Sequence, residues 1–129
     1  MNQPELQKIV DFLKQALPDI QLIYLFGSRV NGSHKSSSDW DIAILGQQKW
    51  DNVQRWELAQ ELSSLLNADV DLVDLMSAST VLNMQVVSKG RLLYGDINIK
   101  DVYETKVYSM YGRLQESRQG IIEQFMADK

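Results

Sequence analysis

The chain has 129 residues, no cysteine and a formal net charge of −4. This suits a single domain with its own hydrophobic core, and it excludes a disulfide framework and a cysteine-based metal site. The acidic balance argues against binding nucleic acid through an overall positive field, although a nucleotide could still bind through metal ions. No apolar run approaches the roughly 20 residues that span a bilayer. We therefore expect a cytoplasmic protein with no membrane partner.

The first third of the chain predicts a helix and then two strands that flank a polar turn. Apolar residues recur at helical spacing over residues 4–16, and Pro18 stops this helix. The near-continuous apolar run of residues 20–26 is typical of a strand covered on both faces. A short helix is expected over residues 28–31, because a serine can cap its start. A polar loop follows, and then a second strand over residues 39–45.

Four more elements are predicted between the second strand and the C-terminal region. A helix over residues 50–66 has one apolar side, made of Val53, Trp56, Leu58, Leu62, Leu65 and Leu66. A third strand is expected over residues 70–75 and a short last strand over residues 91–94. The helix between these strands is capped by either Ser77 or Ser79.

The C-terminal region has helical periodicity over residues 99–126, interrupted by Gly112 and Gly120. Each glycine costs a helix about 1 kcal/mol relative to alanine, so we expect two helical segments or one bent helix. Together the elements predict an α/β layer structure, a small mixed sheet flanked by helices with a C-terminal helical tail. Residues 1–95 would form the core, and residues 96–129 an extension packed on the core or on a partner.

Two carboxylates open the second strand. Asp39 and Asp41 are two residues apart, so their side chains share one face of the sheet while Trp40 points to the other. Two solvated acids are one interpretation of this pattern. The other is a metal site, because Mg²⁺ prefers carboxylate oxygens and completes its shell with water or phosphate oxygens. The turn before the acids favours the metal site.

That turn, Gly27 and Ser28, has the features of a phosphate cradle. Glycine lets the backbone approach a phosphate closely, and the N–H groups that follow can face an anion. The Ser28 hydroxyl can donate to the same phosphate. Arg29 either contacts phosphate too or pairs with an acid that supports the site. Ser38 either hydrogen-bonds the nucleotide or the carboxylates, or belongs to a solvated loop. An anion cradle beside a dication site indicates metal-assisted phosphoryl or nucleotidyl transfer.

A third carboxylate is expected from the strand over residues 70–75. Asp71 is central in this strand with apolar neighbours on both sides. We predict that Asp71 is a buried carboxylate that completes the metal site or takes a proton from the attacking hydroxyl. The alternative is a structural carboxylate satisfied by backbone N–H groups or by an arginine. Asp69 lies nearer the turn and is expected to be solvated.

Gly27-Ser28, ten intervening residues and then Asp39-X-Asp41 resemble the signature of the polymerase-beta-like nucleotidyltransferase superfamily. With Asp71, the chain resembles a minimal nucleotidyltransferase (MNT) domain. The resemblance implies that Gly27 and Ser28 hold the triphosphate of ATP, and that Asp39 and Asp41 coordinate two Mg²⁺ ions. It also implies that Asp71 ligates the catalytic metal and helps activate the nucleophile. The expected reaction is in-line attack on the α-phosphorus, with pyrophosphate leaving.

The region beyond Tyr94 resembles the helical tail of antitoxin-type MNT proteins, which are encoded beside a HEPN-domain ribonuclease toxin. This resemblance implies an antitoxin that transfers AMP from ATP to a tyrosine of a cognate HEPN toxin, with no direct nucleic-acid contact. Two alternatives stay open. A small-molecule acceptor is disfavoured because the short tail offers little to hold it. A non-catalytic antitoxin that acts by occlusion is disfavoured by the intact acids.

Overall fold

A computed structural model describes residues 4–31 and 39–127, with the side chains of residues 4–30 and 39–116. The predicted α/β layer structure is confirmed, and the ends of the elements differ little from those expected. The elements are, in chain order, α1 (Pro4–Ala16), β1 (Ile20–Phe26), α2 (Ser28–Asn31), β2 (Trp40–Gly46), α3 (Asn52–Leu66), β3 (Val70–Asp74), α4 (Thr80–Lys89), β4 (Arg91–Gly95) and α5 (Ile97–Ala127).

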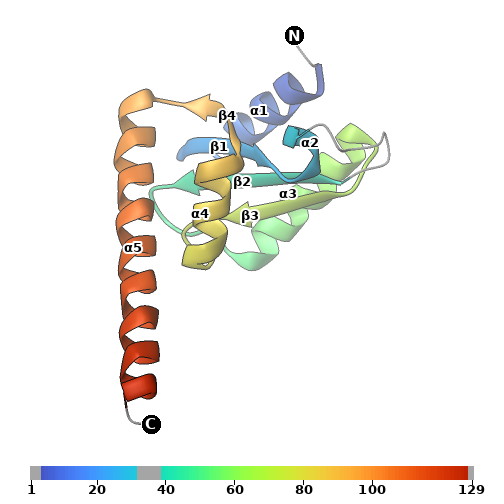
Figure 1. Cartoon of the computed structure of the whole chain (residues 1–129). Helices are drawn as coiled ribbons and strands as arrows, with labels where there is room; N and C mark the ends of the chain where they lie inside the picture. Colours follow the sequence, from blue (N-terminus) through green and yellow to red (C-terminus); the bar gives the residue numbers. More distant parts are fainter. Residues whose placement is uncertain (1–3, 32–38, 128–129) are drawn as a thin grey trace.

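The strands form one four-stranded mixed sheet in the order β3-β2-β1-β4 (Figure 1). β1 is antiparallel to both β2 and β4, whereas β2 and β3 are parallel. The central strands β1 and β2 are therefore hydrogen-bonded on both sides. This arrangement brings the C-terminal end of β1 and the N-terminal ends of β2 and β3 to one end of the sheet.

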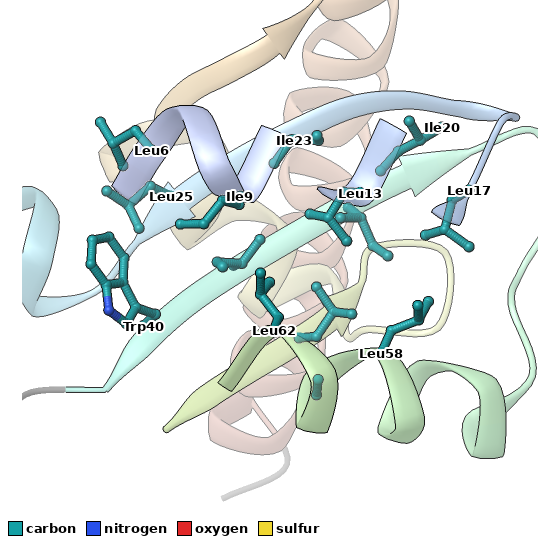
Figure 2. Packing of buried hydrophobic residues seen from close by; sticks show 14 residues of the cluster. Leu6, Ile9, Leu13, Leu17, Ile20, Ile23, Leu25, Trp40, Leu58 and Leu62 are labelled. Carbon is teal, nitrogen blue, oxygen red and sulfur yellow. The ribbon is translucent and has the colours of Figure 1, made fainter. Parts of the chain in front are cut away.

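Helices α1 and α3 cover one face of the sheet, and the main hydrophobic core lies beneath them. Alternate residues of β1 and β2 point into this core, where they meet one side of each helix. Figure 2 shows this packing, whose buried members include Ile9, Leu13, Ile23, Leu25, Trp40, Ile42, Leu58 and Leu62. The continuous apolar runs of the strands arise because α4 and α5 cover the opposite face.

The predicted buried side of α3 is only partly correct. Leu58 and Leu62 are buried, but Val53 and Trp56 are 60% and 63% exposed, and Leu65 is exposed as well. The six apolar residues are spread around the helix, and only the side that includes Leu58 and Leu62 faces the sheet. Leu66 is partly buried against the core, whereas Val53, Trp56 and Leu65 remain on the surface.

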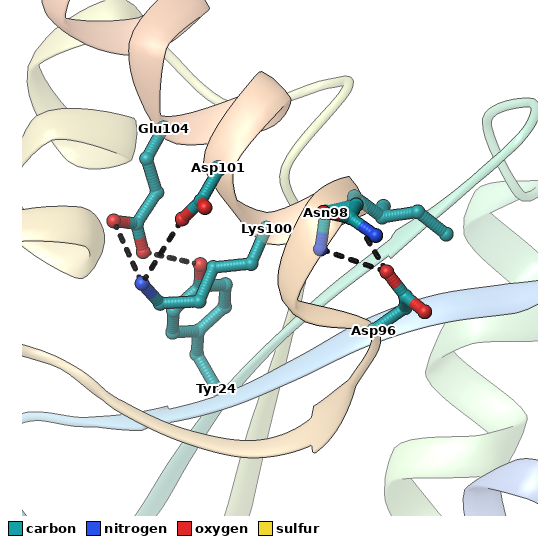
Figure 3. A network of polar contacts seen from close by, with 7 residues as sticks. Tyr24, Asp96, Asn98, Lys100, Asp101 and Glu104 are labelled. Carbon is teal, nitrogen blue, oxygen red and sulfur yellow. Dashed lines mark hydrogen bonds and ion pairs between the residues drawn. The ribbon is translucent and has the colours of Figure 1, made fainter.

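Hydrogen bonds join α5 to the sheet and to α4. The Tyr24 hydroxyl donates to Glu104 Oε2 at 2.7 Å, and Lys100 Nζ lies 3.4 Å from the same carboxylate (Figure 3). The Tyr103 hydroxyl donates to Asn83 Oδ1. Burial is the main cause that raises the pKa of both tyrosines above the ordinary value. The start of α5 is thus held by polar groups that are largely removed from water.

The C-terminal region forms one helix, α5, of 31 residues. Gly112 does not end it, because a penalty of about 1 kcal/mol at one position is small beside the cooperative hydrogen bonding of a long helix. Figure 1 shows that α5 extends well past the edge of the sheet. Within the described part of the chain, we find no helix with both the length and the apolar character needed to cross a bilayer.

Asp74, at the end of β3, is a fully buried carboxylate with 0% exposure. Its Oδ2 accepts a hydrogen bond from the Trp50 backbone N–H at 2.9 Å, and its Oδ1 accepts one from the Met76 N–H at 3.0 Å. Asp74 therefore ties the segment before α3 to the turn after β3. Both N–H groups would lose their partner if this side chain were removed.

We expect Asp74→Ala to lower the free energy of unfolding by about 2 to 4 kcal/mol, because a buried unsatisfied donor costs about 1 to 3 kcal/mol. Urea denaturation measures the loss. Asp74→Asn keeps one acceptor oxygen and should lose less. The matched control is Asp51→Ala, since the exposed Asp51 makes no capping hydrogen bond with its side chain. Equal stability of Asp74→Ala and the control would contradict this role.

Candidate active site

The predicted acids meet at the end of the sheet where β1 stops and β2 and β3 begin. Asp41 of β2 lies opposite Phe26 on one neighbouring strand and opposite Asp71 on the other. Residues opposite each other in neighbouring strands share a face, so the Asp41 and Asp71 side chains lie on the same face of the sheet. Asp39 directly precedes β2 and is exposed to solvent. The structure thus places Asp41 and Asp71 side by side on adjacent strands, with Asp39 directly before β2 at the same end of the sheet.

Gly27 lies against one of these acids. Its φ angle is +79°, in the left-handed region where side chains are disfavoured. A Cβ atom on Gly27 would lie 2.2 Å from Asp41 Oδ2. Because Gly27 has no side chain, the Asp41 carboxylate can lie directly beside the turn. Ser28 follows as the first residue of α2, and the turn is closed by a hydrogen bond from Val30 N–H to the Gly27 carbonyl at 3.1 Å.

Asp41 has an unfavourable electrostatic environment. Burial raises the pKa of its carboxyl group above the ordinary 3.8, and the neighbouring charges of Asp71 and Asp39 raise it further. The three acids together concentrate negative charge around the partly buried Asp41 carboxylate. A divalent cation with a preference for carboxylate oxygens would relieve this repulsion.

The carboxylate oxygens of Asp39, Asp41 and Asp71 are donors that suit Mg²⁺, and because Gly27 has no side chain, the Asp41 carboxylate can lie against the turn. Among the described side chains, no group of three or more His, Cys, Asp or Glu residues is close enough together to hold a metal ion in this structure. The roles of Asp39, Asp41 and Asp71 as metal ligands remain a prediction.

The predicted burial of Asp71 is wrong. Asp71 is exposed, and the buried carboxylate of β3 is Asp74 instead. β3 is an edge strand, and Asp71 is its second residue, at an end of the sheet that no described helix covers. Asp74 lies at the other end beneath the segment before α3, where backbone N–H groups satisfy it. The structural role weighed for Asp71 thus belongs to a residue three positions later.

Arg29 and Trp40 form a contact that sequence reasoning missed. The Arg29 guanidinium carbon lies 4.0 Å from the centroid of the Trp40 ring, within the range of a cation–π interaction. Trp40 points away from the acids, as predicted, and is buried in the main core. The sequence signals that could have indicated this contact are the cationic Arg29 next to the turn and the aromatic Trp40 between the two acids. Ser38 lies outside the described residues, so its predicted role is untested.

Comparisons with known proteins agree with this geometry. Residues 7–98 match the family model described as polymerase beta, nucleotidyltransferase. The protein adenylyltransferase MntA of Shewanella oneidensis is 49% identical over 128 residues, which cover 99% of this chain and 92% of that relative.

Two solved structures extend the comparison. A crystal structure of a toxin–antitoxin with AMP-PNP is 49% identical, with a TM-score of 0.87 and coverage of 96% of this chain and 99% of that one. A structure of the tri-AMPylated Shewanella oneidensis HEPN toxin in complex with MNT antitoxin is 48% identical, with a TM-score of 0.83 and coverage of 98% and 99%. The predicted family is thereby confirmed, and this chain belongs to the polymerase beta nucleotidyltransferase family.

Proposed function

We propose that this protein is an antitoxin that transfers AMP from ATP to a tyrosine of a cognate HEPN ribonuclease toxin. The observation that carries the proposal is the position of Asp41, between the glycine turn and Asp71 at the open end of the sheet. The 49% identity to a protein adenylyltransferase supports the same reaction. The relatives solved with AMP-PNP and with an AMPylated HEPN toxin support the nucleotide and the acceptor.

Each group at the site has a role in this reaction. The backbone of Gly27 and the Ser28 hydroxyl bind the triphosphate, while Asp39 and Asp41 hold two Mg²⁺ ions. These ions, when bound, stabilise negative charge on the phosphates. The tyrosine oxygen forms a bond to the α-phosphorus as the bond to the pyrophosphate oxygen breaks. Asp71 is exposed beside Asp41, where it can accept the phenolic proton from an acceptor that arrives from solvent.

A protein acceptor fits this site better than a small molecule. The structure has a cavity of about 640 Å³, but it lies at the opposite end of the sheet, between Gly46, Leu75 and the Val102 side of α5. None of the predicted site acids lines this cavity. We assign residues 96–129 to an extension that packs on the core or on the toxin. The reaction would take place in the cytoplasm, where ATP and the toxin are present.

Incubation of the purified protein with its cognate HEPN toxin, Mg²⁺ and ATP labelled at the α-phosphate tests the proposal. We expect the label on a toxin tyrosine and a mass increase equal to AMP. ATP labelled at the γ-phosphate should leave the toxin unlabelled, which separates AMP transfer from phosphorylation. Chelation of the metal should stop the reaction. An unlabelled toxin under these conditions would overturn the proposal.

The occlusion alternative has its own test in cells. The double variant Asp39→Asn with Asp41→Asn should lose protection against the toxin while it still binds the toxin in a pull-down. Full protection by this variant would favour occlusion over catalysis.

A further inference from the structure

We propose that Arg29 and Trp40 form a clamp that holds the phosphate turn in register with the metal-binding carboxylates, so that both act as positioning residues for AMP transfer. The inference rests on the proposed function for its catalytic consequence. The clamp itself is a property of the fold and can be tested without catalysis.

The turn and the carboxylates are joined by contacts on both faces of the sheet. On one face the Asp41 carboxylate lies against Gly27, where a Cβ atom would come within 2.2 Å of Oδ2. On the other face the Arg29 guanidinium lies over the Trp40 ring, 4.0 Å from its centroid. Gly27 and Arg29 flank Ser28 in the turn, and Asp41 and Trp40 are neighbours on β2. The two contacts therefore fix the turn to β2 from opposite sides.

Trp40 is a firm anchor for this purpose. The side chain is only 4% exposed and packs in the main core, and Figure 2 shows it beside Leu25 and near Leu6. A buried indole in a close-packed core keeps one orientation. Arg29, by contrast, is partly exposed on the short helix α2. The contact between the Arg29 guanidinium and the Trp40 ring, called the stack below, therefore restrains the turn against the rigid core.

The consequence for catalysis is geometric. Transfer needs the α-phosphorus and the metal-binding acids in a fixed relation, and a misplacement of about 1 Å can lower the rate roughly 100-fold. Loss of the stack would leave ATP bound by the turn but poorly aligned with Asp39 and Asp41. The clamp therefore predicts a lower kcat with little change in nucleotide affinity. A direct phosphate contact by Arg29 predicts the reverse, a loss of affinity that does not depend on Trp40.

The variants are Arg29→Met, Trp40→Leu and their double mutant, with Arg29→Lys as the conservative replacement. A matched control exists in the same fold, because Lys14 lies over the ring of Tyr94 at 4.8 Å from its centroid, in a second cation–π pair formed by α1 and β4. Lys14→Met removes such a pair without touching the turn or the acids. Four quantities are measured for each variant: kcat for AMP transfer, KM for ATP, the Kd of AMP-PNP, and the rate of amide hydrogen exchange over residues 27–30.

We expect Arg29→Met and Trp40→Leu each to lower kcat about 10- to 100-fold and to change the Kd of AMP-PNP less than about threefold. The kcat of the double mutant should be no lower than that of the less active single variant, because both changes remove the same contact. Arg29→Lys should retain much of the wild-type kcat. Exchange at the Val30 amide, which bonds to Gly27, should rise in both single variants. Lys14→Met should change none of these quantities.

Two results would overturn the clamp. One is an equal loss of AMP-PNP affinity on Arg29→Met in the wild-type and Trp40→Leu backgrounds, which identifies a phosphate contact. The other is unchanged amide exchange over residues 27–30. Should Trp40→Leu fail to fold, Trp40→Met, which is apolar and flexible but has no aromatic face, replaces it in the comparison. If the wild-type protein transfers no AMP, the proposed function fails, while the exchange measurement still decides whether the clamp exists.

Discussion

Asp41→Asn is expected to reduce AMP transfer at least about 100-fold and, at the same time, to make the metal-free protein more stable. The loss of activity follows from the loss of a predicted metal ligand, since even the outer partners of metal ligands are worth about 10- to 100-fold. The gain in stability follows first from the burial of the charged Asp41 carboxylate and then from its repulsion by Asp71 and Asp39. Asparagine has the same shape and carries no charge, so it removes this repulsion.

The sign of the stability effect follows from the raised pKa of Asp41. Below the ordinary value of 3.8, the carboxyl group is protonated in both the folded and the unfolded protein. As the pH rises from there through the raised folded pKa, the unfolded chain releases its proton more readily than the folded protein. The folded state therefore loses stability over this interval, and the loss persists at neutral pH. Asp41→Asn abolishes this part of the pH dependence.

Thermal unfolding in the presence of a chelator measures the effect at pH 3.5 and pH 7. The difference in Tm between Asp41→Asn and the wild type should favour the variant at pH 7 and shrink at the lower pH. Asp51→Asn is the control, because Asp51 is exposed and directly precedes α3, next to the segment that bonds the opposite end of β3. A variant less stable than the wild type at pH 7 without metal would contradict this account of Asp41.

Gly27→Ala should lower both activity and stability. An alanine at a φ of +79° costs about 1 to 2 kcal/mol in backbone energy. Its Cβ atom would also lie 2.2 Å from Asp41 Oδ2, so the carboxylate or the turn has to move. We expect kcat to fall roughly 100-fold, because the displaced group is a predicted metal ligand. Enzyme kinetics and urea denaturation measure the two losses.

Gly112→Ala is the control for this variant. Gly112 lies within α5, and a Cβ atom there would meet nothing within 4 Å. Alanine should therefore stabilise the protein by about 1 kcal/mol and leave the Kd of AMP-PNP unchanged. If Gly27→Ala retained wild-type kcat, the close packing of Asp41 against the turn would have no catalytic importance.

The order of elements and the acid pair could be predicted because they depend on local patterns. Apolar runs and alternation placed the strands, and the strand pattern predicted that Asp41 and Asp71 lie at one end of the sheet. The exposure of Asp71 could not be predicted, because it depends on which end of the edge strand β3 a neighbouring segment covers. The Arg29–Trp40 contact could not be predicted either, since it joins a turn and a strand across the chain. The same is true of Val53 and Trp56, whose exposure depends on how α3 is rotated against the sheet.

The hydroxyl groups that hold α5 have a consequence for the alkaline range. Tyr24 and Tyr103 both have a pKa raised above the ordinary 10.0 in the folded protein, chiefly by burial. Above pH 10 the unfolded chain ionises these phenols while the folded protein still keeps them neutral. The stability present at lower pH is therefore lost progressively as the pH rises through the raised values. Because these phenols donate hydrogen bonds to Glu104 and Asn83, strong base would act first where α5 is attached to the sheet and to α4.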